Sequence, residues 1–183
     1  MKKHPLAFID LETTGLDPER HEIIEIGCII ARQSPRPGMG PSVEKVEEFE
    51  IKVKPEHIET ADKEALRISG YAEGDWLFAS DLKQAMTVLS EKTHDAIMVG
   101  QNVSFDWGFL EKAWGKTGIP HSMDYHKLDT MSLAYAKLYD KDDAQKFSLR
   151  ALCDHFGVKN ERAHTALSDI RATFEVYKKL LDC

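Results

Sequence analysis

The sequence predicts an α/β fold in which helices flank a mixed five-stranded sheet. Two observations lead to this prediction: three strand patterns follow one another near the amino end, and helical and strand patterns alternate in the rest of the chain. The chain has 183 residues, of which 42% are hydrophobic and 30% charged. This length leaves room for one folded domain, residues 1–183, and not for a second.

The three strand patterns come first and are short and apolar. Strands are predicted over residues 6–9, 23–31 and 46–53, the third with Val46, Phe49, Ile51 and Val53 as its apolar members. A loop rich in Pro and Gly, residues 33–41, separates the second pattern from the third. Three consecutive strands favour an antiparallel meander.

Helical patterns dominate after residue 60 and alternate with two short strands. Helices are expected over residues 61–68 and 80–91, from a Ser104 N-cap to Lys116, from about residue 130 to Leu138, from a Ser148 N-cap to Gly157, and over residues 165–181. The strands are residues 96–100 and 128–130, and residues 141–145 form a polar loop. In the last helix the apolar residues recur at helical spacing, at Leu167, Ile170, Phe174, Tyr177 and Leu181. This order of elements suits a ribonuclease H-like fold.

Charge and cysteine content narrow the class of protein. A formal net charge of −7 disfavours a broad basic surface for long duplexes, so any contact with nucleic acid should be short. Three scattered cysteines are too few for a disulfide framework or a Cys-rich zinc site, which predicts a reducing, cytoplasmic setting. No apolar stretch reaches the roughly 18 residues that span a bilayer, and the short apolar run after Met1-Lys2-Lys3 predicts neither secretion nor a membrane partner.

Two carboxylates follow the apolar residues of the first strand. Because strand side chains alternate, one face carries Leu6, Phe8, Asp10 and Glu12, and the other carries Ala7, Ile9 and Leu11. Both faces are apolar, so the strand should be central and its two acids poorly solvated and mutually repelling. Residues 13–16 supply no cation, and a hard divalent cation such as Mg²⁺ would compensate the charges. The pair alone also fits an exposed strand end or a turn cap.

Two more acids lie where they could join this pair. Asp106 is expected in the first turn of a helix after a buried strand, where an acid also fits a simple interaction with the helix dipole. Asp169 has the small same-face neighbours Ala166, Ala172 and Thr173, which permit close approach to the sheet. For Asp169, metal ligation and an ordinary structural role are comparable interpretations of the pattern.

His164 precedes Asp169 by five residues, which on a regular helix would place the two side chains about 140° apart. The histidine should therefore lie at the helix start or in the preceding loop, and approach Asp169 from another direction. An imidazole whose pKa is near neutrality suits a general base. A surface histidine at the start of a helix is the ordinary alternative.

Three segments with acidic residues share a combined pattern. They are F-I-D-L-E-T-T-G-L from Phe8 to Leu16, N-V-S-F-D-W-G-F-L from Asn102 to Leu110, and A-H-T-A-L-S-D from Ala163 to Asp169. In residue types, order and spacing they resemble the motifs of the DEDDh, or DnaQ-like, 3′→5′ exonucleases, the family that includes the proofreading epsilon subunit of bacterial DNA polymerase III. Residues 128–130 and 148–158 extend the resemblance over most of the chain.

The resemblance implies a metal-dependent 3′→5′ exonuclease that releases nucleoside 5′-monophosphates from the 3′ end of single-stranded DNA or RNA. It also implies that two divalent cations, Mg²⁺ or Mn²⁺, are held by Asp10, Glu12, Asp106 and Asp169. His164 would activate the attacking water, and Glu12 is counted as catalytic as well. Substrate contacts are implied for Thr13, Thr14, Gly15, Leu16, Asn102 and Phe105. Phe105 also fits a core residue that anchors its helix, and a contact from Ile68 rests on a looser match.

Two other functions fit the same residues. One is an exoribonuclease, or oligoribonuclease, that acts on short RNA as a homodimer. The other is an inactive nucleic-acid-binding module of a polymerase, which predicts a damaged metal constellation, whereas all five positions carry competent side chains. Proofreading subunits usually continue into a polymerase-binding tail, but this chain stops at Cys183, so DNA polymerase association is unproven and would need another surface such as residues 35–41.

Overall fold

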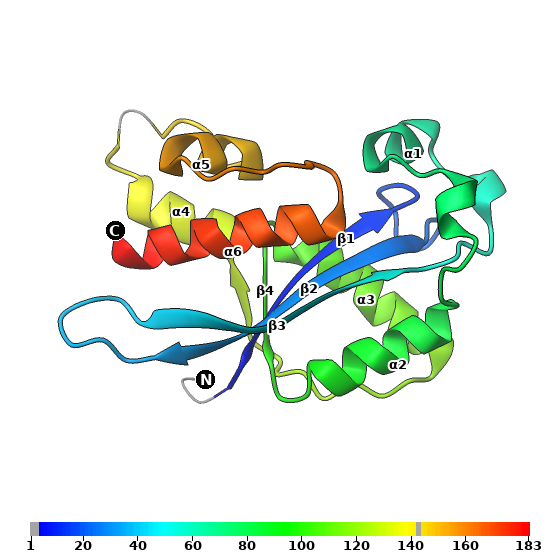
Figure 1. The fold of residues 1–183 in the computed structure, drawn as a ribbon, viewed down its shortest axis with the longest axis horizontal. Coiled ribbons are helices and arrows are strands. Elements are labelled where there is room, and N and C mark those ends of the chain that lie inside the picture. The colour runs from blue at the N-terminus through cyan, green and yellow to red at the C-terminus, as the bar shows by residue number, and fades with distance from the viewer. Residues whose placement is uncertain (1–3, 142–143) are drawn as a thin grey trace.

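Five strands form one mixed sheet in the order β3-β2-β1-β4-β5 (Figure 1). This computed structural model describes residues 4–141 and 144–183. The strands are β1 (Leu6–Thr13), β2 (Ile23–Ser34), β3 (Ser42–Lys52), β4 (Ile97–Gly100) and β5 (Lys127–Asp129). The first three are antiparallel neighbours, β4 pairs in parallel with β1, and β5 pairs in parallel with β4. The predicted mixed sheet and its meander are confirmed, and β1 is central.

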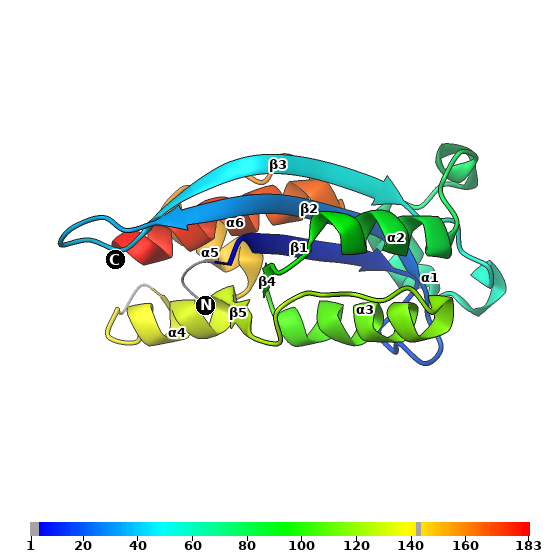
Figure 2. The ribbon, with the colours of Figure 1, turned by 90° about the horizontal axis from the view of Figure 1, so that it is seen from below.

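Helices cover both faces of this sheet. On one face lie α2 (Leu82–Lys92) and α3 (Val103–Thr117), and on the other lies α6 (Ala166–Asp182), packed against α4 (Thr130–Leu138) and α5 (Leu149–Phe156). The segment between β3 and α2 holds α1 (Lys63–Ser69) and two 3₁₀ turns, η1 (Ile58–Thr60) and η2 (Glu73–Trp76). Figure 2 shows α2 and α3 on one side of the strands and α5 and α6 on the other.

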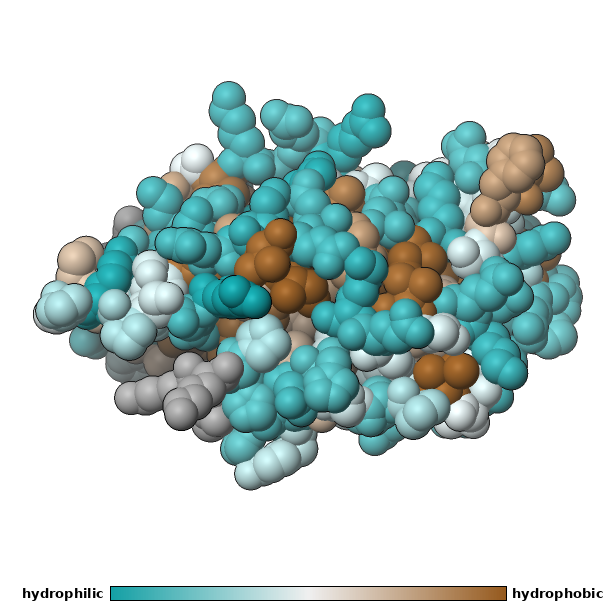
Figure 3. Space-filling model, turned by 60° about the horizontal axis from the view of Figure 1, so that its bottom comes forward, coloured by the Kyte–Doolittle hydropathy of each residue, from teal (hydrophilic) through white to brown (hydrophobic). Residues whose placement is uncertain are grey.

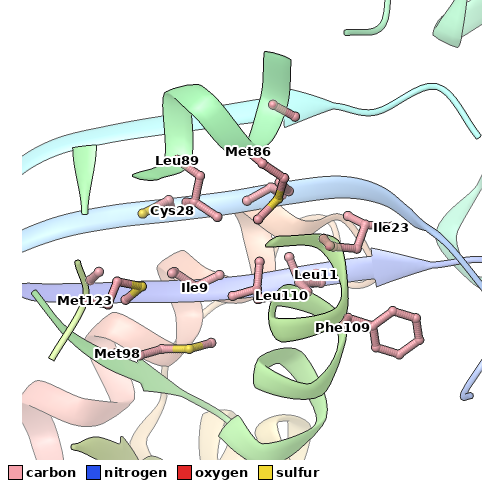
Figure 4. Packing of buried hydrophobic residues seen from close by; sticks show 14 of the residues in the cluster. Ile9, Leu11, Ile23, Cys28, Met86, Leu89, Met98, Phe109, Leu110 and Met123 are labelled. Atoms are coloured by element: carbon pink, nitrogen blue, oxygen red, sulfur yellow. The ribbon is translucent and has the colours of Figure 1, made fainter. Parts of the chain in front are cut away.

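β1 is apolar on both faces because each face meets its own set of helices. Ile9 and Leu11 point to the cluster formed with α2 and α3 (Figure 4). Phe8 points the other way and packs edge-on against Phe174 and Tyr177 of α6, with ring centroids 5.0 Å and 5.2 Å apart. The predicted alternation along β1 is therefore confirmed. The acids that follow Phe8 with the same alternation face α6.

The strand bounds differ from the predicted ones at three places, one of which is β2, which continues to Ser34 rather than ending at residue 31. β1 continues to Thr13 rather than ending at residue 9, because its acidic residues also pair with β2. β3 starts at Ser42, and its register against β2 shifts so that Val46 is an extra residue between Lys45 and Glu47. Val46 lies in β3 as predicted, but it is 54% exposed and breaks the alternation of the strand. A β-bulge resets the alternation of side chains, and the sequence pattern did not reveal it.

The helices agree with the predicted ones within two residues, apart from the start of α3. Its N-cap is Asn102, in a left-handed conformation with φ 62° and ψ 50°, and not Ser104, which lies inside the helix. The Asn102 N–H instead donates to Asp129 Oδ1 over 2.9 Å, which fixes the tight turn from β4 into α3. Ser148 caps α5 as predicted, because its side chain accepts a hydrogen bond from the Ala151 N–H. In the predicted polar loop 141–145, residues 142–143 lie outside the described residues, as do residues 1–3.

α6 lies unusually close to the β2–β3 part of the sheet at both of its ends. A Cβ atom on Gly27 of β2 would be 2.3 Å from the carbonyl carbon of Ala166, and one on Gly40 would be 2.1 Å from the carbonyl oxygen of Leu181. Only glycine leaves room for backbone at such distances. The helix is also buried on a second side, where Val176 and its neighbours pack against α4 and α5. The apolar residues that predicted this helix from the sequence did not indicate this second buried side.

The described part of the chain contains no helix long and apolar enough to cross a bilayer. On the face drawn in Figure 3, apolar side chains form separate patches among hydrophilic ones.

Candidate metal centre

Three of the four predicted ligand carboxylates converge at the carboxyl end of β1. Asp10 and Glu12 project from β1 toward α6, and Asp169 projects from the first turn of α6. One carboxylate oxygen from each residue lies within 4.8 Å of the others, and all three residues are half-buried. Within residues 4–141 and 144–183, no other three His, Cys, Asp or Glu residues come together in this way.

Asp169 is held in this position by two neighbouring segments of the chain. Its Oδ1 accepts a hydrogen bond from Asn160 Nδ2 at 2.5 Å, and its Oδ2 accepts one from the His164 N–H at 3.2 Å. Asn160 Oδ1 in turn accepts from the Ser168 hydroxyl at 2.8 Å. These contacts fix the carboxylate in one orientation and join the loop before α6 to the helix.

Asp106 lies beside this group but is not one of its three members. It occupies the first turn of α3 as predicted, is only 3% exposed, and accepts a hydrogen bond from the Leu11 N–H through Oδ1 at 3.0 Å. Its charge still reaches the group, because it raises the pKa of Asp10 and of Glu12. The structure therefore places all four predicted acids around the end of β1.

The electrostatics of the group are unfavourable without a cation. Burial raises the pKa of Asp10 well above its ordinary value, and the charges of Asp106, Asp169, Glu12 and Glu25 raise it further. Burial, followed by the charges of Asp169, Glu25 and Asp106, raises the pKa of Glu12 to about 8. Burial also raises the pKa of Asp106 to about 8, against the opposing effect of the Leu11 N–H.

This charge and donor set fit a hard divalent cation. All the donor atoms are carboxylate oxygens, which Mg²⁺ and Mn²⁺ prefer, and no soft sulfur ligand takes part. In the part of the chain that the structure describes, no lysine or arginine forms a salt bridge with Asp10, Glu12 or Asp169. A cation would therefore remove a repulsion that the protein itself leaves uncompensated.

His164 lies in the loop before α6, as its spacing from Asp169 predicts. Its backbone is left-handed, with φ 71°, and the residue is exposed. Such a conformation costs free energy for a residue other than glycine and needs support from its surroundings. Here the N–H donated to Asp169 supplies that support. The backbone of this exposed histidine is consequently fixed beside the carboxylate of Asp169.

The predicted substrate-binding residues at the end of β1 and in the turn that follows have either buried or exposed side chains. Thr13 donates its hydroxyl to the Gly15 carbonyl at 2.7 Å, and the Thr14 hydroxyl accepts from the Glu22 N–H at 2.9 Å. Both threonine side chains are therefore used in the β1–β2 turn. Leu16 is 78% exposed and is free to meet a ligand.

Asn102 and Phe105 lie at the start of α3, next to Asp106. Asn102 is exposed, whereas Phe105 is half-buried, with its ring centroid 5.1 Å from that of Phe109. Phe105 also packs against the hydrophobic cluster between the sheet and helices α2 and α3. Much of its surface therefore fits the alternative interpretation, in which the residue anchors its helix. The side chain is only half-buried, so part of it remains accessible.

Two residues of this region were not singled out from the sequence. Asn160, described above, has no distinguishing pattern around it. Glu25 is 3% exposed and is paired across the β1–β2 ladder with Glu12. The signal that could have revealed Glu25 is its position, since it is the one charged residue in the apolar run between Ile23 and Ala31.

The family model RNase_T, described as exonuclease, matches residues 7–177. Among curated proteins, the PolC-type DNA polymerase III of Thermotoga maritima is 27% identical over 176 residues, which are 96% of this chain and 12% of that protein. The PolC-type polymerase of Staphylococcus aureus is 25% identical over 181 residues, again 12% of its length. The chain thus spans about one-eighth of the length of these relatives.

Solved structures of exonuclease I have the same fold. One that addresses how exonuclease I achieves processivity matches with a TM-score of 0.77 at 17% identity, over 98% of this chain and 43% of that chain. Exonuclease I of E. coli in complex with a dT13 oligonucleotide matches with a TM-score of 0.76 at 18% identity, over 97% of this chain and 41% of that chain.

Proposed function

Because the chain belongs to the RNase_T family of exonucleases, we propose that it is a metal-dependent enzyme that removes nucleotides from the 3′ end of single-stranded DNA. The family match covers the three motifs, so the resemblance to exonucleases in the sequence is confirmed, as is the class of enzyme, a hydrolase that cleaves nucleic acid. The observation that carries the metal-dependent proposal is the convergence of Asp10, Glu12 and Asp169, three carboxylates without a compensating cation among the described residues.

In the proposed enzyme, Asp10, Glu12, Asp106 and Asp169 hold two divalent cations, Mg²⁺ or Mn²⁺. The all-oxygen donor set and the raised pKa values of Glu12 and Asp106 support this assignment. When bound, the cations supply positive charge that offsets the phosphate and lowers the pKa of a water molecule. The carboxylates hold their positions through the sheet, the Leu11 N–H and Asn160.

His164 acts as the general base in this proposal. It takes a proton from the water that attacks the terminal phosphorus, while the bond from phosphorus to the 3′ oxygen of the preceding nucleotide breaks. The products are a nucleoside 5′-monophosphate and a strand shortened by one nucleotide. The left-handed backbone of His164 and the hydrogen bond from its N–H to Asp169 support this role, because they fix the residue next to one of the carboxylates.

Leu16, Asn102 and Phe105 form the proposed contact with the terminal nucleotides. Leu16 and Asn102 are exposed, and the accessible part of the Phe105 ring offers a surface on which a base can stack. The turn of Thr13, Thr14 and Gly15 would contribute through its backbone, since both threonine hydroxyls are already hydrogen-bonded.

DNA is the proposed substrate because the similar proteins act on DNA. The curated relatives are DNA polymerases, and the exonuclease I structures include complexes with dT13 and dA16 oligonucleotides. The similarity to PolC-type DNA polymerases also supports the proposal that this chain associates with a DNA polymerase. The three free cysteines support a reducing, cytoplasmic setting.

A labelled-strand assay tests this function. Single-stranded DNA and RNA of one sequence, labelled at the 5′ end, are incubated with the protein and Mg²⁺, Mn²⁺ or EDTA. We expect a ladder of DNA strands shortened from the 3′ end with either metal, no shortening in EDTA, and slower cleavage of RNA. Cleavage that persists in EDTA would contradict the metal-dependent mechanism, and cleavage from the 5′ end would contradict the polarity.

A further inference from the structure

Glu25 is a buried acid to which the proposed reaction gives no role. It lies on β2 beside Glu12 of β1 and is 3% exposed. Its Oε1 accepts a hydrogen bond from the Ala166 N–H over 2.9 Å, across 141 positions of the sequence. A glutamate buried to this extent normally has a specific partner, and here the partner is the first residue of α6.

This hydrogen bond replaces a cap that the helix otherwise lacks. The first N–H groups of a helix have no partner within it, and a side chain just before the helix usually accepts from one of them. Thr165, the N-cap residue of α6, makes no such bond. Glu25 does so from the neighbouring strand, and its negative charge is also favourable at the positive end of the helix.

A second contact from the same strand holds the same residue. Gly27 lies so close to Ala166 that a Cβ atom on the glycine would be 2.4 Å from the Ala166 carbonyl oxygen. β2 therefore positions Ala166 by a hydrogen bond at its N–H and by backbone contact at its carbonyl. Figure 1 shows the chain entering α6 beside the end of β1, where the acidic group lies.

Ala166 lies between the two functional residues of this segment. His164 is two positions before it and Asp169 three positions after it, and the His164 N–H is bonded to Asp169. A shift of Ala166 would therefore move both residues relative to Asp10 and Glu12 of β1. We propose that Glu25 is a positioning residue, which anchors the first turn of α6 so that His164 and Asp169 are held against the carboxylates of β1.

The surroundings of Glu25 favour this role over that of another metal ligand. Its oxygen is not part of the group whose atoms lie within 4.8 Å of one another. Burial raises its pKa to about 7, and a hydrogen bond that protonated Glu25 donates to the side chain of Glu50 contributes to the rise. Glu25 is therefore engaged by Ala166 and by Glu50, both of which lie outside the proposed cation site.

This inference rests on the proposed function for its catalytic consequence, but its structural part can be measured in inactive protein. The experiment compares Glu25→Ala and Glu25→Gln with Glu48→Ala as a matched control. Glu48 is an acid of β3 that bonds to Arg171 of α6, one turn beyond the anchored segment. Glutamine retains an oxygen that can accept from Ala166 and an NH₂ group that can donate to Glu50.

The first readout is hydrogen exchange of the Ala166 amide in metal-free protein. We expect Glu25→Ala to speed this exchange at least about tenfold, and Glu25→Gln and Glu48→Ala to leave it near the wild-type rate. The second readout is kinetic. We expect kcat of Glu25→Ala to fall about 10–100-fold, as for a small misplacement of reacting groups, with KM for the oligonucleotide changed less than about threefold.

Unchanged exchange of Ala166 in Glu25→Ala would overturn the anchoring role. Accelerated exchange with unchanged kcat would overturn the catalytic consequence. A Glu25→Gln variant as impaired as Glu25→Ala would assign the effect to the charge of Glu25 and not to its hydrogen bond with Ala166. If Glu25→Ala does not fold, Gly27→Ala, which displaces Ala166 and keeps the acid, should show the same faster exchange and lower kcat. Wild-type protein without nuclease activity would refute the proposed function and still leave the exchange result to decide the anchor.

Discussion

The carboxylate of Asp106 accepts a hydrogen bond from the Leu11 N–H at 3.0 Å, between the two acidic residues of β1. This contact ties the first turn of α3 to the central strand just beyond the end of β4. Asp106 therefore has a structural role, because it accepts a hydrogen bond from a buried N–H. Its proposed second role is to supply negative charge that binds cations. Substitution can separate the two.

Asp106→Asn should keep the fold and lose the activity. Asparagine can still accept from the Leu11 N–H, so unfolding by urea should change little, while turnover falls on the order of 10²–10³-fold because one charge at the site is lost. Asp106→Ala should also leave the N–H unpaired and lower the free energy of unfolding by about 1–3 kcal/mol. Equal destabilisation of the two variants would show that the acceptor does not matter.

His164→Ala should separate catalysis from cation binding. We expect turnover to fall about 10²–10⁴-fold, the usual contribution of a general base, with Mn²⁺ affinity in titration calorimetry close to that of wild type. The matched control is His94→Ala, because His94 is exposed and precedes β4 at the amino end of the parallel strands, opposite to the end where the acids lie. Wild-type turnover in the His164 variant would remove this imidazole from the mechanism.

Asp10→Asn should stabilise the metal-free protein while it weakens cation binding. Burial and four neighbouring acids disfavour the charge of Asp10, so its removal should raise the free energy of unfolding by about 0.5–2 kcal/mol. Thermal unfolding in EDTA and in Mg²⁺ measures both effects, and the metal-induced rise in Tm should be lost. Glu91→Gln, a change of equal charge on the exposed surface of α2, should alter neither value. A metal-free Asp10→Asn protein with a lower Tm than wild type would argue against the electrostatic strain.

The stability of the metal-free protein should fall as the pH rises from about 4 to about 8. The pKa values of Glu12 and Asp106 are raised to about 8, from ordinary values of 4.5 and 3.8. Their contribution to stability is complete below the unfolded values, and it is lost as the pH rises through the folded ones, because the unfolded chain releases these protons first. Bound cations favour the ionised forms, so Mg²⁺ should flatten the slope.

Urea unfolding at several pH values, in EDTA and in Mg²⁺, measures this slope. Glu12→Gln in EDTA should show a shallower fall than wild type. A metal-free protein whose stability rises steadily between pH 5 and pH 8 would contradict the raised pKa values.

Much of the fold and the approach of the acids could be predicted because they depend on local periodicity. The alternation along β1 places Phe8 on the α6 face, and this in turn places Asp10 on that face. The small residues around Asp169 indicated the close approach of α6, and five-residue spacing placed His164 outside the helix. The roles of these residues in catalysis stay predictions.

The parts that the sequence did not reveal depend on contacts between distant segments or on single backbone conformations. The bulge at Val46 and the left-handed Asn102 follow from local geometry that has no periodic signal. Glu25 and Asn160 act on α6 and Asp169 through hydrogen bonds that only the folded chain brings together. A pattern of residue types cannot specify such pairs.

Crystals grown with Mn²⁺, examined by anomalous diffraction, test the central claim of an acidic cation site most directly. We predict two anomalous peaks within coordination distance of the carboxylates of Asp10, Glu12, Asp106 and Asp169, and loss of at least one peak in Asp10→Asn. A map without peaks at these carboxylates, in protein that shortens DNA with Mn²⁺, would contradict the account.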